Sequence, residues 1–281
     1  MSELHDRMRV DSWADWWGGF CALYEMANAQ IGNLRHGMKV LRASEFAAQF
    51  YCEQKLDLRL LVRARQFQDW QRRTSSEDVE GRTDPLALGV RGHEKLAASD
   101  TERPAEEVWS SVMKGEKVRL YDPLLLGKYE EIFLAGHPDV ILFANRIPEL
   151  VIEFKFSAKS IPSAQYHSQA GLYCYMLEGL GFDVKNLHYV LGIFPPSAFA
   201  SNALSLATDL IANSFPFSRS SMELPEGTAC LYASRYNRAS SIKELRWASD
   251  YWRGTRDAVP TKVDWKCRAC SAKQVCRFSL A

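Results

Sequence analysis

Charged residues within two consecutive apolar segments constrain this chain more than any other feature. The sequence runs from Asp139 into Val-Ile-Leu-Phe, passes a short turn, and continues through the apolar segment 150–156, which contains Glu153 and Lys155. Such segments are typical of buried strands, where a charge is costly unless it meets an opposite charge or a metal ion. Side chains alternate along a strand, so Glu153 and Lys155 share one face. A hairpin would place Asp139 beside them, and this set suits a hard divalent cation and an activated water.

The segments on either side of this pair predict the fold class. We expect strands at about 116–121 and 130–136, with Gly136 permitting a bend or bulge that brings Asp139 towards the site. A helix from about Ser163 and a buried strand at 187–195 should follow. The order strand, strand, helix, strand predicts an α/β fold with a mixed central sheet flanked by helices.

Helices are expected before and after this core. Residues 1–40 look helical and rich in Trp, and we interpret the Trp cluster as a packing face, with a partner-binding face as the alternative. A helix with Ser44 as N-cap should follow, and residues 99–107 should form a polar linker. A further helix is expected from Ser241 to about Arg256.

Cysteines near the C-terminus predict a metal site. Cys267, Cys270 and Cys276 form a CxxCxxxxxC pattern, and packing alone does not call for three cysteines so close together. A tetrahedral thiolate site needs a fourth ligand from elsewhere in the chain. Thiolate ligands alone do not separate zinc from an iron–sulfur cluster, so both remain open at this point.

Composition and the N-terminus limit the function classes. A net charge of +1 shows no global basic signature for nucleic acid, so any such binding must come from local patches. We find no apolar run long enough for a membrane span and no signal-peptide pattern at the N-terminus. We therefore expect a soluble, cytoplasmic protein with no membrane partner.

The Asp139 and Glu-x-Lys pattern resembles the PD-(D/E)XK nuclease superfamily, although two strand ends with solvated charges would produce the same short pattern. With the cysteines included, the chain from about residue 41 onwards is similar to RecB-type nucleases that carry a 4Fe–4S cluster, above all the CRISPR-associated RecB-like exonuclease family. The single-strand exonuclease V group shares the same architecture. The matching positions, in chain order, are Tyr51-Cys52, His93, Gly136-His-Pro-Asp139, Glu153-Phe154-Lys155, Gln169 with Tyr173, and Cys267, Cys270 and Cys276.

The resemblance implies roles for these residues. Asp139 and Glu153 would bind Mg²⁺ or Mn²⁺, with the Phe154 backbone carbonyl and His93 completing the ligand set. Lys155 would position or help deprotonate the attacking water. Gln169 and Tyr173, which share one helix face, would fix the DNA backbone or Lys155. The 4Fe–4S ligands would be Cys52, Cys267, Cys270 and Cys276.

The resemblance also implies a domain organisation. The implied organisation is a PD-(D/E)XK (restriction-endonuclease-like) core within a single nuclease domain over 1–281. The parts would be a helical N-terminal extension at 1–40, a helical part with the first cysteine and the histidine at 41–100, a catalytic core at 115–195, and a C-terminal helix with the Fe–S cysteine triplet at 230–281. The cluster would tie the two ends of the chain together.

A metal-dependent exonuclease for single-stranded DNA or overhangs is therefore the leading hypothesis. By resemblance it would process DNA fragments for CRISPR spacer acquisition with integrase proteins, and a homo-oligomer is compatible with this. The alternatives are the nuclease component of a recombination or repair complex with a helicase partner, and a non-catalytic DNA-binding scaffold that retains the fold.

A local basic region offers one DNA-binding surface. Between Arg235 and Arg277 there are eleven Lys or Arg residues against four acidic ones. Trp247, Tyr251, Trp252 and Trp265 lie among them and would stack on bases. The alternative interpretation is a solvated helix face.

Overall fold

The computed structural model describes residues 12–70, 104–157, 160–195, 203–214, 220–224 and 229–281. His93 lies outside the described residues. The helices are α1 (Trp13–Asn28), η1 (Arg35–Gly37), α2 (Ala43–Trp70), α4 (Ala105–Met113), α5 (Ala164–Gly179), α6 (Ala203–Ser214), α7 (Arg238–Trp252) and α8 (Asp264–Arg268). The strands are β1 (Leu41–Arg42), β2 (Val118–Tyr121), β3 (Leu125–Tyr129), β4 (Ile132–Gly136), β5 (Val140–Ala144), β6 (Ile147–Phe156), β7 (His188–Phe194), β8 (Ser221–Glu223) and β9 (Cys230–Arg235).

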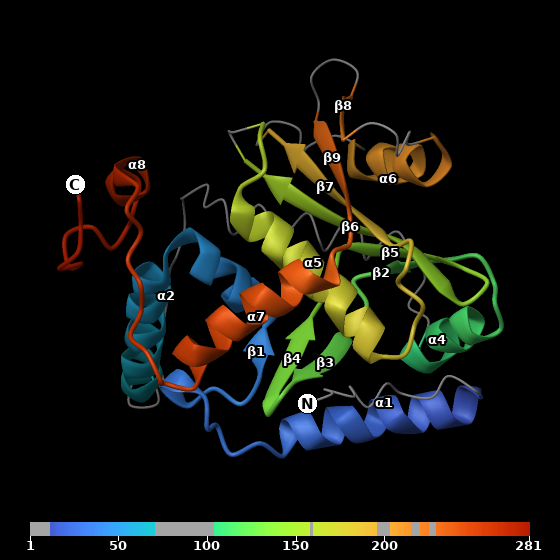
Figure 1. The fold of residues 1–281 in the computed structure, drawn as a ribbon, viewed down its shortest axis with the longest axis horizontal. Coiled ribbons are helices and arrows are strands. Elements are labelled where there is room, and N and C mark those ends of the chain that lie inside the picture. The colour runs from blue at the N-terminus through green and yellow to red at the C-terminus, as the bar shows by residue number, and fades with distance from the viewer. Residues whose placement is uncertain (1–11, 71–103, 158–159, 196–202, 215–219, 225–228) are drawn as a thin grey trace.

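A six-stranded mixed sheet forms the centre of the molecule (Figure 1), in the order β2-β5-β6-β7-β9-β8. Strands β5 and β6 pair antiparallel, as the hairpin prediction requires, and β6 pairs parallel with β7. A parallel pair needs a crossover connection, which α5 supplies. The expected mixed α/β fold with flanking helices is therefore confirmed.

Helix α5 is buried along most of its length because it has neighbours on several sides. It contacts β6 and β7 of the large sheet, β3 of a three-stranded sheet ordered β1-β4-β3, and helices α2 and α7. Its residues from Ser168 to Glu178 are all buried. The main apolar core lies on this side, and α6 covers a second core on the opposite face of the large sheet. Helix α5 therefore positions the site residues that it carries.

The N-terminal tryptophans form a packing face, as the first of the two interpretations predicted. Trp16 is fully buried and donates a hydrogen bond from Nε1 to the Leu180 carbonyl at 2.9 Å. Its ring lies against Phe20 and Trp109. Helix α1 is thus part of the core.

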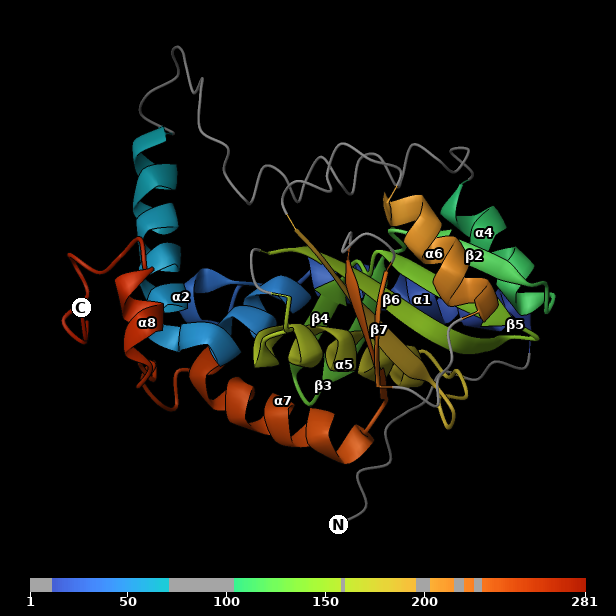
Figure 2. The ribbon, with the colours of Figure 1, turned by 90° about the horizontal axis from the view of Figure 1, so that it is seen from above.

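Helix α2 changes direction at Cys52. The backbone there is extended (φ −172°, ψ 111°) within an otherwise helical segment, and Figure 2 shows the two parts running in different directions. The second part stands beside α8 in both ribbon views. The break therefore brings Cys52 near the C-terminal segment.

Four local expectations were wrong. Ser44 is not an N-cap, because the helix begins at Ala43 directly after β1. Gly136 makes no bulge: it pairs in register with Leu125, and the irregularity lies at Leu142/Phe143. The strand expected at 130–136 begins at Ile132, because Glu130 adopts φ 50° in the β3–β4 turn. The linker expected at 99–107 is helical from Ala105.

Within the described residues, no helix combines the length and the apolar character needed to cross a bilayer.

Candidate active site and cysteine pocket

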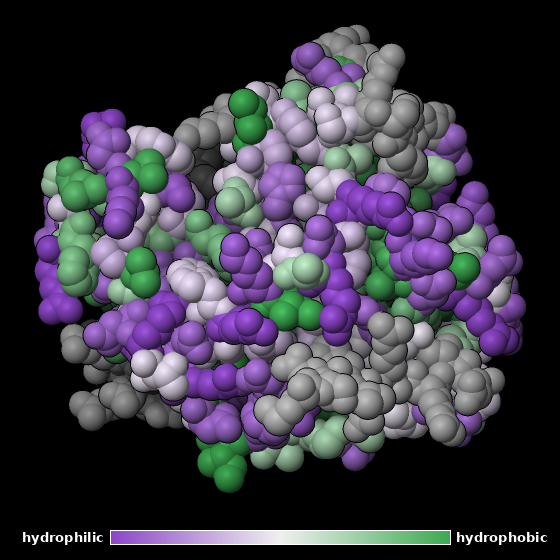
Figure 3. Space-filling view, in the orientation of Figure 1, coloured by the Kyte–Doolittle hydropathy of each residue, from purple (hydrophilic) through white to green (hydrophobic). Residues whose placement is uncertain are grey.

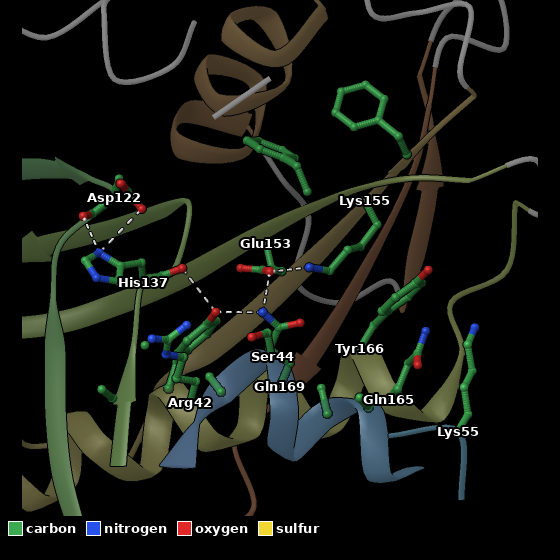
Figure 4. A pocket seen from close by; sticks show the side chains of 18 residues that line it. Arg42, Ser44, Lys55, Asp122, His137, Glu153, Lys155, Gln165, Tyr166 and Gln169 are labelled. Carbon is green, nitrogen blue, oxygen red and sulfur yellow. Dashed lines mark hydrogen bonds and ion pairs between the residues drawn. The ribbon is translucent and has the colours of Figure 1, made fainter. Parts of the chain in front are cut away.

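The side chains of Glu153 and Lys155 line a cleft of about 780 Å³ beside the C-terminal half of β6. Strand alternation places both on one face, as predicted, and this face lies towards α5. Residues lining the cleft come from α2, β4, β6 and α5, and Figure 4 shows their side chains around Glu153. Glu153 is almost fully buried, whereas Lys155 keeps about a fifth of its side chain exposed. The cleft therefore presents a carboxylate at its floor and an ammonium nearer its opening.

A hydrogen-bond chain connects the cleft residues. Gln169 donates from Nε2 to Glu153 Oε1 at 2.8 Å and to the Tyr173 hydroxyl oxygen at 2.7 Å. The Tyr173 hydroxyl donates to the His137 carbonyl at 3.1 Å. Lys155 Nζ reaches the same Glu153 oxygen at 2.5 Å. Because Gln169 and Tyr173 are spaced i, i+4, Tyr173 holds the Gln169 amide, which in turn orients the Glu153 carboxylate.

Asp139 lies beneath this chain and follows β4 just before β5. It is 1% exposed, and its Oδ2 accepts a hydrogen bond from the Phe154 backbone N–H at 2.5 Å. Phe154 and Lys155 line the cleft, but Asp139 does not. Asp139 therefore fixes the backbone between Glu153 and Lys155.

Gly136 is required by close packing at this point. A Cβ there would come within 2.6 Å of the Tyr173 ring and 2.8 Å of the Ala43 Cβ. The glycine in the Gly-x-x-Asp sequence thus lets Tyr173 approach the strand.

The two ionisable groups beside Glu153 have shifted pKa values. Burial opposes the charge on Lys155, but Glu153 and Asp139 favour it more strongly, and the pKa of Lys155 is raised. Burial, and then the Glu153 charge, raises the pKa of Tyr173 well above its usual value. At neutral pH Lys155 is a cation and Tyr173 a neutral hydrogen-bond donor.

The four predicted cysteines line one pocket. Cys52 comes from the break in α2, and the triplet comes from α8 and the segment after it. The backbone N–H groups of Thr261 and Ala272 donate to the sulfurs of Cys52 and Cys270, each at 3.4 Å. Three cations also line the pocket: Lys55, Lys266 and Lys273. These groups place positive charge and hydrogen-bond donors beside the sulfurs.

The remaining cysteines lie apart from this pocket. Cys174 is buried in α5, and Cys21 and Cys230 are partly exposed in α1 and β9. Among the residues that the structure describes, no three His, Cys, Asp or Glu side chains are gathered closely enough to hold a single metal ion.

The aromatic stacking surface predicted for the C-terminal region is wrong for Tyr251 and Trp252, whereas Trp247 and Trp265 remain exposed. Tyr251 and Trp252 are fully buried in the core. Trp247 packs against Phe50 and carries the Arg256 guanidinium over its ring at 4.4 Å. Tyr251 and Trp252 are buried because α7 packs against α5.

Sequence reasoning missed several residues of the cleft. Arg42, Lys55 and Tyr166 line it, and none belongs to a recognisable motif. They come from β1, the second part of α2 and the start of α5. Only the tertiary arrangement brings these segments together.

Comparisons with known proteins find little. No protein-family model matches the chain, and no curated protein sequence matches it. Among solved structures, the chain is similar to one described as "Crystal structure of SSO0001", at 14% identity and a TM-score of 0.38. The similar region covers 70% of this chain and 71% of that chain. The function must therefore be argued from the site itself.

Proposed function

We propose that the protein is a metal-dependent nuclease with a PD-(D/E)XK-type core that degrades single-stranded DNA or overhangs. The observation that carries the proposal is the Glu153–Lys155 pair in an open cleft, with Asp139 directly behind it. The antiparallel β5–β6 hairpin, followed by α5 and the parallel strand β7, supports the core assignment.

The donor set fits a hard divalent cation. Asp139 and Glu153 offer carboxylate oxygens, which Mg²⁺ and Mn²⁺ prefer, and the Phe154 carbonyl is the third ligand that we propose from the described residues. His93, outside the described part, would be the fourth. When bound, the ion would supply Lewis-acid polarisation of the scissile phosphodiester.

The protein side chains have distinct tasks in this proposal. Gln169 orients the Glu153 carboxylate, and Tyr173 holds Gln169 by linking it to the His137 carbonyl. Lys155 remains a cation, so it would stabilise negative charge on the phosphate and position the attacking water. Asp139 holds the peptide of Phe154 and thereby the geometry of the pair.

The ligand chemistry of the cysteine pocket supports a thiolate-bound cofactor. Cys52, Cys267, Cys270 and Cys276 would hold a 4Fe–4S cluster, and the lysines and N–H groups around them would offset its negative charge. Zinc is the rival occupant by ligand type, because four thiolates also suit a structural zinc ion, but the described sulfurs are not gathered closely enough to hold a single ion.

Two biological settings agree with this chemistry. In the first, the enzyme trims DNA fragments for CRISPR spacer acquisition together with integrase proteins. In the second, it is the nuclease of a recombination or repair complex with a helicase partner. The identity of neighbouring genes separates the two.

The nuclease proposal is tested by degradation of single-stranded DNA in Mn²⁺ or Mg²⁺, with EDTA as the metal-free control. We expect Glu153→Ala and Lys155→Ala each to lower the rate by a factor of at least about 10² to 10³, as for other groups that stabilise transition-state charge. DNA binding in EDTA should survive both changes.

Glu149→Ala is the matched control, because Glu149 lies on the same strand with its side chain exposed. Its rate should equal that of the wild type. Cleavage that persists in both Glu153→Ala and Lys155→Ala would show that the site is wrongly assigned. DNA binding without cleavage in any divalent metal would favour the non-catalytic scaffold.

A further inference from the structure

The cleft continues beyond the Glu153–Lys155 pair along the second part of α2. A neighbouring pocket of about 320 Å³ shares Ala48, Lys55 and Gln165 with the cleft. The same pocket shares Tyr51, Cys52 and Lys55 with the cysteine pocket. Lys55 therefore lines all three spaces, which follow one another along α2.

Cations lie on both sides of the carboxylate centre. Figure 4 shows Arg42 and Lys55 on opposite sides of the cleft, with Glu153 and Lys155 between them. Arg59 lines the continuation and follows Lys55 by four residues, so the two lie on the same face of the helix. A polyanion crossing the cleft would meet Arg42 before the Glu153–Lys155 pair, and Lys55 and Arg59 after it.

The break at Cys52 creates this arrangement. The first part of α2 contributes Ala43 and Ala47 to the cleft wall, and the second part departs from the cleft in a new direction. A straight helix would carry residues at positions 55 and 59 along the axis of the first part. The break instead places Lys55 at the cleft and Arg59 in its continuation.

Three of the arginines on and just after α7 are held in ion pairs. Arg238 pairs with Glu178, Arg253 with Glu130, and Arg256 with Glu53. These ion pairs neutralise three of the cations that the sequence places in this region. Lys243 and Arg246 on the same helix are exposed.

We propose that one strand of DNA crosses the cleft from Arg42 to Lys55 and continues past Arg59 along the second part of α2, with its phosphates on these cations. Lys55 and Arg59 are then substrate-positioning residues outside the reacting centre. This inference rests on the proposed nuclease function and adds the path of the substrate. Phosphate contacts of this kind bind without sequence preference.

The test measures binding of fluorescent oligothymidylates of about 4 and about 16 nucleotides, the range that single-strand sites span, in EDTA and at several salt concentrations. Lys55→Gln and Arg59→Gln should each weaken binding of the longer strand about tenfold, the effect of losing one charged hydrogen bond. Each should also reduce the slope of log K against log salt by about 0.7. Binding of the shorter strand should change less than about twofold, since fewer phosphates can reach these cations.

Lys114→Gln is the matched control, with the same charge change on an exposed residue at the end of α4, and it should leave both affinities unchanged. Lys55 also lines the cysteine pocket, so Lys55→Gln could weaken binding by disturbing that pocket. Arg59→Gln tests the DNA contact without this effect, because Arg59 does not line the cysteine pocket. If wild type degrades DNA while both variants behave like Lys114→Gln, the path is overturned and the nuclease proposal stands. A wild type that neither binds nor degrades single-stranded DNA overturns the proposed function itself.

Discussion

Lys155 shows how neighbouring charges outweigh burial at a single residue. Its ammonium loses solvation in the cleft, which opposes its charge, but Glu153 and Asp139 lie close enough to reverse the balance. The pKa of Lys155 is therefore raised. A lysine activated as a general base by burial would show the opposite shift. The raised pKa supports a role in charge stabilisation and water positioning.

A pH series on the ion pair tests this interpretation. Lys155→Met should lower the free energy of unfolding in EDTA by about 2 kcal/mol, because the buried Glu153 carboxylate loses a charged hydrogen bond. A raised pKa means that this contribution is fully present below the unfolded value of about 10.4 and is lost as pH rises through the folded value. The difference between variant and wild type should thus stay constant from about pH 7 to about pH 9 in urea unfolding.

Lys128→Met is the control for the loss of a lysine. Lys128 and its partner Glu131 are both well exposed, so its effect should stay below about 1 kcal/mol. If the difference in unfolding free energy between Lys155→Met and wild type fell to half by about pH 8, the pKa of Lys155 would instead be lowered by burial.

At the scale of elements, a buried polar network joins α2 to the segment after α7. Arg256 binds both carboxylate oxygens of Glu53, at 2.6 and 2.7 Å, and the Val259 N–H donates to the same group at 2.8 Å. Gln49 donates to Glu53 and accepts from the Trp252 indole. This network follows directly from the helix break, since Glu53 is the first residue after Cys52.

Removing the arginine should destabilise the protein strongly. In Arg256→Met the Glu53 carboxylate stays buried without its bidentate partner, and we expect a loss of about 3–5 kcal/mol. Guanidinium or urea unfolding measures the difference.

Arg268→Met provides the matched comparison. Arg268 pairs with Asp264 one helical turn away, and both side chains are exposed, so the expected loss is below about 1 kcal/mol. Equal losses in the two variants would show that the Glu53 network contributes no more than a surface ion pair.

At the scale of the whole molecule, the C-terminal segment buries little apolar surface of its own. Several of its large apolar side chains remain exposed, namely Val263, Trp265, Val275, Phe278 and Leu280. In the space-filling view (Figure 3), green apolar residues appear on the lobe that contains α8, at the left. Contacts to α2, including the Lys266 ammonium on the Tyr51 carbonyl at 3.0 Å, and the cysteine pocket connect this lobe to the rest. A metal cofactor would therefore contribute directly to its folding.

Replacing Cys52 should lower the metal content and the thermal stability together. We expect anaerobically purified wild type to contain about four irons and matching sulfide per chain, and Cys52→Ser to lose most of both and unfold at a lower temperature. Iron, sulfide and zinc analysis with thermal unfolding measures this. Cys21→Ser, remote from the pocket on α1, should retain the metal.

Zinc in place of iron would remove the cluster assignment and leave the nuclease proposal intact. Full iron content in Cys52→Ser would show that Cys52 is not a ligand.

The sequence by itself predicted the elements whose signals are local. Charges in apolar strands indicated the β5–β6 hairpin and the Glu153–Lys155 face, and i, i+4 spacing placed Gln169 with Tyr173. The close spacing of the cysteine triplet indicated a metal site, and the family resemblance added Cys52. Each signal depends on short-range periodicity or residue chemistry, which a linear sequence retains.

Tertiary structure alone decided the features that depend on long-range packing. It placed Arg42 and Lys55 at the cleft, put Tyr251 and Trp252 in the core, and paired Arg256 with Glu53 across 203 positions of the chain. It also broke α2 at Cys52, against a helical sequence pattern on both sides. Burial and ion pairing across distant segments outweigh local propensity at such positions, because each contact involves more free energy than a residue's helix preference.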